Sequence, residues 1–79
     1  MHQLTLYHFV GCSYCQKVRN YMQQAGISIT MKDTHANPAY RDELTKLGGK
    51  SQVPCLTIDG KALYESNDII EWFKKNWKK

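Results

Sequence analysis

The alternation of apolar and polar positions divides the chain into seven short elements. Runs that alternate or are rich in β-branched residues predict strands over residues 3–8, 27–31, 53–58 and 61–64. Between and after them, apolar residues recur at three- and four-residue steps, which is the spacing of a helix face. The expected apolar faces contain Cys15, Val18, Met22 and Ala25 in the first helix, Tyr40, Leu44 and Leu47 in the second, and Ile69, Ile70, Phe73 and Trp77 in the third.

Residues with special backbone preferences mark where these elements begin and end. Gly26 predicts the end of the first helix, and Gly48-Gly49 that of the second. Asn37-Pro38 predicts a helix start, with asparagine as N-cap and proline at the first helical position. Asp59-Gly60 predicts a two-residue hairpin turn, and Ser66 is expected to cap the last helix.

The predicted order is β-α-β-α-β-β-α, which indicates an α/β fold. A strand–helix–strand crossover places its two strands parallel, whereas the later hairpin is antiparallel. We therefore expect a four-stranded mixed sheet flanked by three helices. With 79 residues there is room for one small core, so residues 1–79 are expected to form a single domain.

Charge and composition exclude several classes of function. The net charge of +4 is supplied by four lysines at the end of the chain, Lys74, Lys75, Lys78 and Lys79. Lysines in the last turns of a terminal helix complement the helix dipole, so nucleic-acid binding is not expected. No run of 18 apolar residues occurs and Met1-His2-Gln3-Leu4 does not look like a secretory signal. We expect no membrane partner.

The cysteines carry the candidate chemistry. There are three, Cys12, Cys15 and Cys55, and an odd number argues against a framework of structural disulfides. The first two form a C-x-x-C motif, which suits a reducing compartment where the pair cycles, so we expect a cytoplasmic protein. A C-x-x-C motif can also form half of a zinc site, and Cys55, His2, His8 and His35 are available as further ligands. None of these residues forms a second, closely spaced pair of ligands, which zinc sites usually have. We expect no metal.

The position of the motif favours thiol–disulfide exchange. If the first helix begins near Cys12, its first-turn N–H groups and the positive end of its dipole favour a thiolate there. Cys15 follows one turn later, close enough to attack a mixed disulfide on Cys12. Cys55 lies in an apolar strand, where a buried, inert thiol is expected.

Three segments in order resemble a glutaredoxin: Cys12-Ser13-Tyr14-Cys15, Val53-Pro54, and Tyr64-Glu65-Ser66-Asn67-Asp68. The third is closer to the Glu-Ser signature of glutathione transferase N-terminal domains. The resemblance covers nearly the whole chain and implies a thioredoxin-like fold. It also implies a monomeric glutathione-dependent thiol–disulfide oxidoreductase, with disulfide-containing or glutathionylated proteins as partners.

The resemblance assigns roles to individual residues. Cys12 is the implied nucleophile and Cys15 the resolving thiol, with glutathione as co-substrate. Pro54 is the implied cis proline, and Val53 offers its backbone to the cysteine of glutathione. The remaining implied contacts are Tyr14 beside the sulfur, Ser66 and Asn67 at the γ-glutamyl carboxylate, Glu65 at the γ-glutamyl amine, and Lys50 or Gln52 at the glycyl carboxylate.

Two departures from the family pattern leave alternatives open. Phe9 stands where many members carry a cation, and Ser13 replaces the usual proline. Some relatives with Cys-Ser-Tyr-Cys bind a [2Fe–2S] cluster as glutathione-ligated dimers, so an iron–sulfur carrier or scaffold is one alternative. A glutaredoxin-like electron donor to ribonucleotide reductase, itself reduced by thioredoxin reductase, is another.

Overall fold

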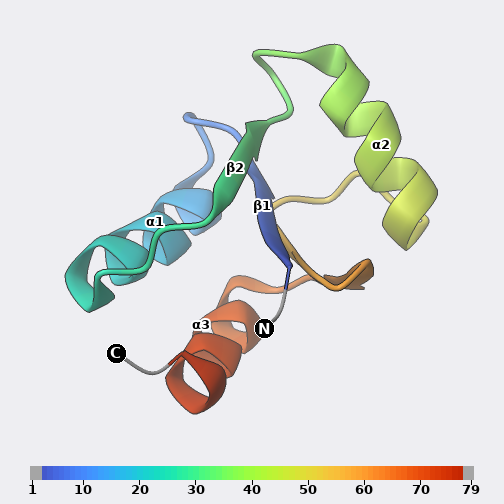
Figure 1. Cartoon of the computed structure of the whole chain (residues 1–79). Helices are drawn as coiled ribbons and strands as arrows, with labels where there is room; N and C mark the ends of the chain where they lie inside the picture. Colours follow the sequence, from blue (N-terminus) through green and yellow to red (C-terminus); the bar gives the residue numbers. More distant parts are fainter. Residues whose placement is uncertain (1–2, 78–79) are drawn as a thin grey trace.

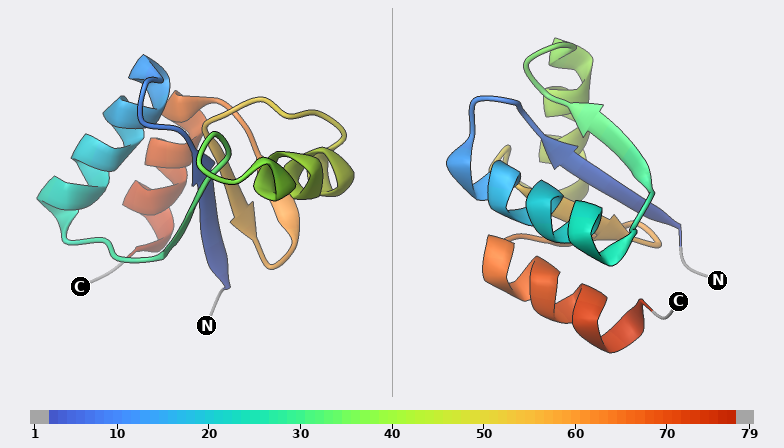
Figure 2. Two further views of the ribbon diagram at one scale, coloured as in Figure 1. Left: turned by 90° about the horizontal axis from the view of Figure 1, so that it is seen from above. Right: turned by 90° about the vertical axis from the view of Figure 1, so that its left-hand side faces the viewer.

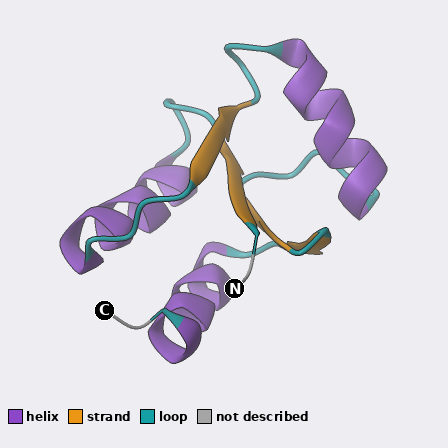
Figure 3. Cartoon of the chain, viewed as in Figure 1, coloured by secondary structure: helices purple, strands orange, loops and turns teal. Residues whose placement is uncertain are grey.

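The computed structural model describes residues 3–77. Its seven elements follow the expected order β-α-β-α-β-β-α (Figures 1 and 3). They are β1 (Leu4–His8), α1 (Ser13–Ala25), β2 (Thr30–Asp33), α2 (Pro38–Gly48), β3 (Cys55–Ile58), β4 (Lys61–Leu63) and α3 (Ser66–Asn76). The expected fold class is therefore confirmed.

The four strands form one mixed sheet in the order β2-β1-β3-β4. β1 runs parallel to β2, with Leu6 opposite Met31, and antiparallel to β3, with Leu6 opposite Leu56. β3 and β4 form the antiparallel hairpin, and both turn residues between them, Asp59 and Gly60, have positive φ. β1 is thus an inner strand, and the loop after its carboxyl end leads directly to Cys12.

The helices lie on both faces of the sheet and make three layers. α1 and α3 lie side by side on one face and α2 covers the other (Figure 2). Because β1 is covered on both faces, neighbouring residues serve different cores: Leu6 packs with Val18 and Phe73 beneath α1 and α3, and Tyr7 packs with Leu44 beneath α2.

The predicted helix boundaries are confirmed at four of the six ends. Cys12 is the N-cap of α1, and Gly26 follows the helix in the left-handed conformation with φ of 71°. The Asn37 side chain caps α2 by accepting a hydrogen bond from the N–H of Ala39, and Gly49 ends that helix with φ of 85°. These are positions where the residue type is dictated by backbone geometry.

Each of the four strand predictions misplaces at least one end of its strand. The N–H of Ile27 donates to the carbonyl of Met22 at the end of α1, residues 27–29 are in neither a helix nor a strand, and β2 runs from Thr30 to Asp33 instead of over residues 27–31. β3 begins at Cys55 because Pro54, in a cis peptide with Val53, has no N–H for the ladder. β1 begins one residue late and β4 ends one residue early.

Two expectations about the helices were wrong. Leu47 was expected on the apolar face of α2, but 44% of it is exposed, while Leu44 is fully buried. Ser66 was expected to cap α3, but Glu65 occupies the N-cap position and Ser66 is the first helical residue. Glu65 has φ of 69°, an unusual value for a residue with a side chain.

Some sequence-based expectations concern residues 1, 2, 78 and 79, which lie outside the described part of the chain. They include His2 as a metal candidate and the Lys78–Lys79 part of the lysine cluster. Among residues 3–77, no helix is long and apolar enough to cross a membrane.

Candidate active site around Cys12

Cys12 and Cys15 lie at the head of α1 in different environments. Cys12 is partly exposed, whereas Cys15 has no exposed surface. The Cys12 N–H donates to the carbonyl of Phe9 at 3.2 Å, and its own carbonyl accepts the first helical hydrogen bond from Gln16 at 3.0 Å. The Cys12 side chain therefore sits at the positive end of the helix dipole, with free first-turn N–H groups beside it.

The buried thiol of Cys15 is held in its protonated form. The pKa of Cys15 is raised to about 12, mainly by burial, and the hydrogen bond to the Cys12 sulfur and the negative charge of that sulfur act in the same direction. A hydrogen bond to the Phe9 backbone, which is the second-largest contribution, and the smaller effect of the Arg19 charge both lower the pKa of Cys15. A protonated Cys15 can donate to a thiolate at Cys12 but cannot compete with it as the attacking group.

A hollow of about 270 Å³ lies at the head of α1 and brings together segments that are far apart in the sequence. It contains seven of the eight residues to which the sequence assigned glutathione contacts. The lining residues are Tyr14, Lys17, Gln52, Val53, Pro54, Glu65, Ser66 and Asn67. Cys12 itself is not among them, but Tyr14, two residues further along, forms one rim.

The segment before β3 supplies one wall of the hollow. The Val53–Pro54 peptide is cis, as the resemblance implied. Pro54 is buried, and Val53 is partly exposed. Because β3 begins only at Cys55, the Val53 backbone lies outside the sheet ladder and is available to an extended ligand.

The first turn of α3 supplies the opposite wall. The N-cap residue Glu65 makes no side-chain capping bond, so the first N–H groups of α3 have no such partner. Ser66 is only 8% exposed, and Asn67 and Glu65 are exposed. Free N–H groups at a helix N-terminus, next to a carboxylate, suit a ligand that carries both a carboxylate and an amine.

Lys50 does not line the hollow, although the sequence placed it at the glycyl carboxylate. Its ammonium group lies 4.5 Å from the centre of the Tyr64 ring, and its carbonyl accepts a hydrogen bond from the Tyr64 hydroxyl at 2.9 Å. These contacts attach the loop before Val53 to the end of β4. Lys50 therefore has a structural contact here, and Gln52 is the lining residue of that segment.

Lys17 is the lining residue that the sequence reasoning missed. It stands three positions after Tyr14 in α1, so both side chains lie on one face of the helix. Its Nζ lies 2.6 Å from Oδ1 of Asn67, which ties α1 to the start of α3. The three-residue spacing from Tyr14 was the available signal.

The other residues singled out near the motif do not enter the hollow. The Phe9 ring stacks on His35, with ring centres 4.0 Å apart and planes 3° from parallel. His8 is buried, and its Nδ1 has no hydrogen-bond partner among the described residues. Burial, together with the nearby charge of Arg19, lowers the pKa of His8. Cys55 is fully buried as expected, and burial raises its pKa to about 11.

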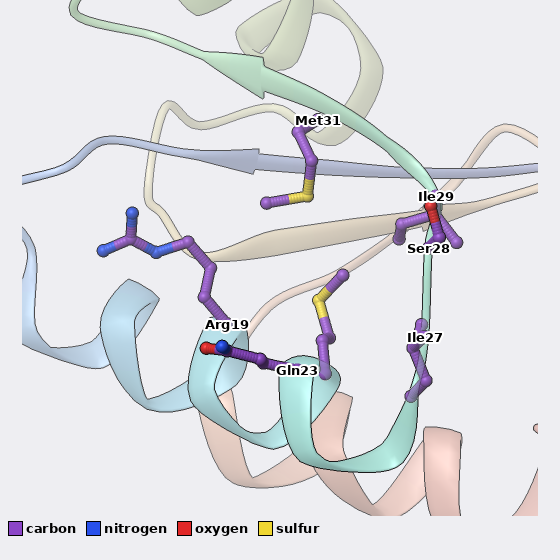
Figure 4. Close-up of a pocket in the computed structure, with 7 residues that line it drawn as sticks. Arg19, Gln23, Ile27, Ser28, Ile29 and Met31 are labelled. Atoms are coloured by element: carbon purple, nitrogen blue, oxygen red, sulfur yellow. The ribbon is translucent and has the colours of Figure 1, made fainter.

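A second, larger hollow of about 360 Å³ lies between the second half of α1 and the segment leading into β2 (Figure 4). Its lining is mostly apolar and includes Met22, Ile27, Ile29 and Met31, with Arg19 at one side. None of its lining residues is a cysteine, a histidine or an acid. It therefore offers neither a thiol nor a general base, and the smaller hollow is the candidate site.

Metal binding was the alternative use of the C-x-x-C motif. Within residues 3–77, no group of three or more histidine, cysteine, aspartate or glutamate side chains is placed to hold a metal ion. The three cysteines are free thiols.

Comparison with known proteins shows that this chain is similar to glutaredoxins and glutathione transferases. Glutaredoxin 3 of Escherichia coli (strain K12) is 26% identical over 69 residues, which cover 87% of this chain and 83% of the relative. Oxidized glutaredoxin 2 from Chlamydomonas reinhardtii superposes with a TM-score of 0.69 at 26% identity, over 94% of this chain and 73% of the other.

A transferase is also similar. Glutathione transferase Omega 3C from Trametes versicolor superposes with a TM-score of 0.79 at 31% identity, over 92% of this chain. The chain spans only 33% of that transferase. Residues 6–78 match the family described as glutathione S-transferase, N-terminal domain. The chain therefore belongs to the glutathione S-transferase N-terminal domain family, whose thioredoxin-like fold it shares with the glutaredoxins.

Proposed function

We propose that this protein is a glutathione-dependent thiol–disulfide oxidoreductase that acts on protein disulfides and protein–glutathione mixed disulfides. One observation carries the proposal. A partly exposed cysteine at a helix N-terminus stands next to a fully buried partner thiol, with a hollow of about 270 Å³ at the same end of that helix. The similarity to glutaredoxins and glutathione transferases supports glutathione as the co-substrate.

The first step is a thiol–disulfide exchange at Cys12. Its thiolate attacks the glutathione sulfur of a mixed disulfide, so a Cys12–glutathione disulfide forms as the protein–glutathione bond breaks. The target protein leaves as a thiolate and takes up a proton from water. The buried Cys15 thiol donates its hydrogen bond to the Cys12 sulfur before the attack and thus favours the reactive form.

Two routes regenerate the enzyme. A second glutathione thiolate attacks the glutathione sulfur on Cys12, which releases oxidised glutathione and the Cys12 thiolate. Alternatively, Cys15 loses its proton, attacks the Cys12 sulfur and releases reduced glutathione, which leaves a Cys12–Cys15 disulfide. Since burial disfavours the Cys15 thiolate, we expect the first route to dominate with glutathionylated substrates.

The hollow matches the chemistry of glutathione. The free backbone of Val53 suits pairing with the cysteine of the tripeptide, and Tyr14 borders its sulfur. The first-turn N–H groups at Ser66 and Asn67 suit the γ-glutamyl carboxylate, and the exposed Glu65 carboxylate suits its amine. Gln52 also lines the hollow and suits the glycyl end of the tripeptide.

Substitution of each cysteine tests the proposal. In a glutathione-coupled assay with a glutathionylated peptide, we expect Cys12→Ser to abolish turnover and Cys15→Ser to keep much of it. Full activity of Cys12→Ser would refute the proposal. Recovery of the dithiol form by glutathione but not by thioredoxin reductase would separate this function from that of a thioredoxin-reductase-dependent electron donor.

A further inference from the structure

Lys17 occupies a position that elementary electrostatics disfavours in the absence of a ligand. Its Nζ lies 2.6 Å from Oδ1 of Asn67, the second residue of α3. A helix N-terminus carries a partial positive charge, so a cation there is unfavourable and an anion is favourable. Lys17 makes no ion pair with any described residue, so neither nearby acid, Glu65 or Asp68, neutralises it.

The same corner of the hollow contains a polar side chain without a hydrogen-bond partner. Ser66 is only 8% exposed and lines the hollow, and no hydrogen bond of its hydroxyl is found within residues 3–77. The hydroxyl oxygen itself keeps accessible surface, so it can meet a ligand in the hollow. Together with Lys17 and the first-turn N–H groups, which no side chain caps, it makes a set of donors at one corner of the hollow, in which Lys17 donates to Asn67.

The geometry points to Lys17 as a specificity-determining residue that binds the α-carboxylate of the γ-glutamyl group, together with the Ser66 hydroxyl and the first turn of α3. This inference rests on the proposed function. An ammonium group has three donors, and Asn67 accepts from one of them, which leaves two for a carboxylate. Lys17 would then distinguish glutathione from thiols that lack this carboxylate.

The test compares Lys17→Gln with the native chain on three mixed disulfides of one peptide. The first carries glutathione, the second carries 4-aminobutyryl-cysteinylglycine, which lacks the α-carboxylate, and the third carries glutaryl-cysteinylglycine, which lacks the amine. We expect Lys17→Gln to lower kcat/KM about fivefold for the first and third, through KM, and to leave the second unchanged. Lys17→Arg should restore most of the loss.

Lys75→Gln is the matched control, because it removes the same charge from an exposed position at the far end of α3. It should change none of the three substrates. An equal loss for all three with Lys17→Gln, or no loss for glutathione, would overturn the role of Lys17. If the native chain shows no turnover with glutathione, the proposed function fails instead, so the two failures are distinguishable.

Discussion

At the scale of single residues, the chemistry depends on differences in exposure and pKa among the three cysteine thiols. Cys12 is partly exposed at the head of α1, whereas Cys15 and Cys55 have no exposed surface. Burial raises the pKa of Cys15 to about 12 and that of Cys55 to about 11. Only the thiolate is nucleophilic, and the two buried thiols are held in their protonated form, so Cys12 is the accessible candidate nucleophile.

Alkylation of the native protein compares the reactivity of the three cysteines. With iodoacetamide at pH 7.5, the reduced protein should take up one equivalent, at Cys12, while Cys15 and Cys55 stay unmodified because their thiols are buried and protonated. The urea-unfolded protein, in which all three are accessible, is the control. Comparable labelling of Cys55 in the native protein would show that the buried state assigned to it is wrong.

At the scale of elements, the site depends on how the loop before Pro54 is attached to the end of β4. The Tyr64 hydroxyl donates to the carbonyl of Lys50, and the Lys50 ammonium lies over the Tyr64 ring. Tyr64 also packs against Gly48, where an added Cβ would overlap its hydroxyl. The last turn of α2 and both walls of the hollow thus meet at Tyr64.

Substitution of Gly48 tests this attachment. Helix preference alone predicts that Gly48→Ala stabilises the protein by about 1 kcal/mol. The contact with Tyr64 predicts the opposite, a loss of about 1–3 kcal/mol in the free energy of unfolding from overpacking. Urea unfolding decides between them, with Lys46→Ala, an exposed position of α2, as control. If Gly48→Ala stabilises the protein, the Tyr64 side chain can move away from the added methyl group, and the contact between Tyr64 and the end of α2 is not rigid.

Sequence patterns predicted the elements well where the residue type is tied to one backbone geometry. Gly26, Asn37 and Asp59-Gly60 each stand where they were expected. Predictions failed where a contact between distant segments determines the boundary of an element or the position of a side chain. Ile27 is held by the end of α1, so the start of β2 could not be read from its alternation. The Lys50–Tyr64 and Lys17–Asn67 contacts join residues 14 and 50 positions apart, which no local pattern reveals.

At the scale of the whole molecule, the sheet separates two small cores. A cysteine thiol is buried on each face of the sheet, and burial favours its neutral form. Cys55 packs with Tyr7 and Leu44 beneath α2. Cys15 is buried at the head of α1, on the opposite face. A thiol whose folded pKa lies above its unfolded value stabilises the fold fully below the unfolded pKa. That contribution disappears as the pH rises toward the folded pKa.

Alkaline pH should therefore destabilise the protein in a defined window. For Cys55 the window runs from its ordinary value of 9.0 to about 11, because the unfolded thiol ionises while the buried one does not. Between pH 8 and pH 10, the native chain should lose about 1 kcal/mol more unfolding free energy than Cys55→Ala. Parallel stability–pH profiles of the two proteins would contradict this prediction.

Direct detection of the mixed disulfide on Cys12 is the measurement that tests the central claim most closely. Cys15→Ser, which cannot resolve the intermediate internally, is incubated with oxidised glutathione and analysed by mass spectrometry and peptide mapping. One glutathione should be found, attached to Cys12, and reduced glutathione should remove it. No adduct on the folded protein, or an adduct on Cys55 instead, would contradict the assignment of Cys12 as the nucleophile.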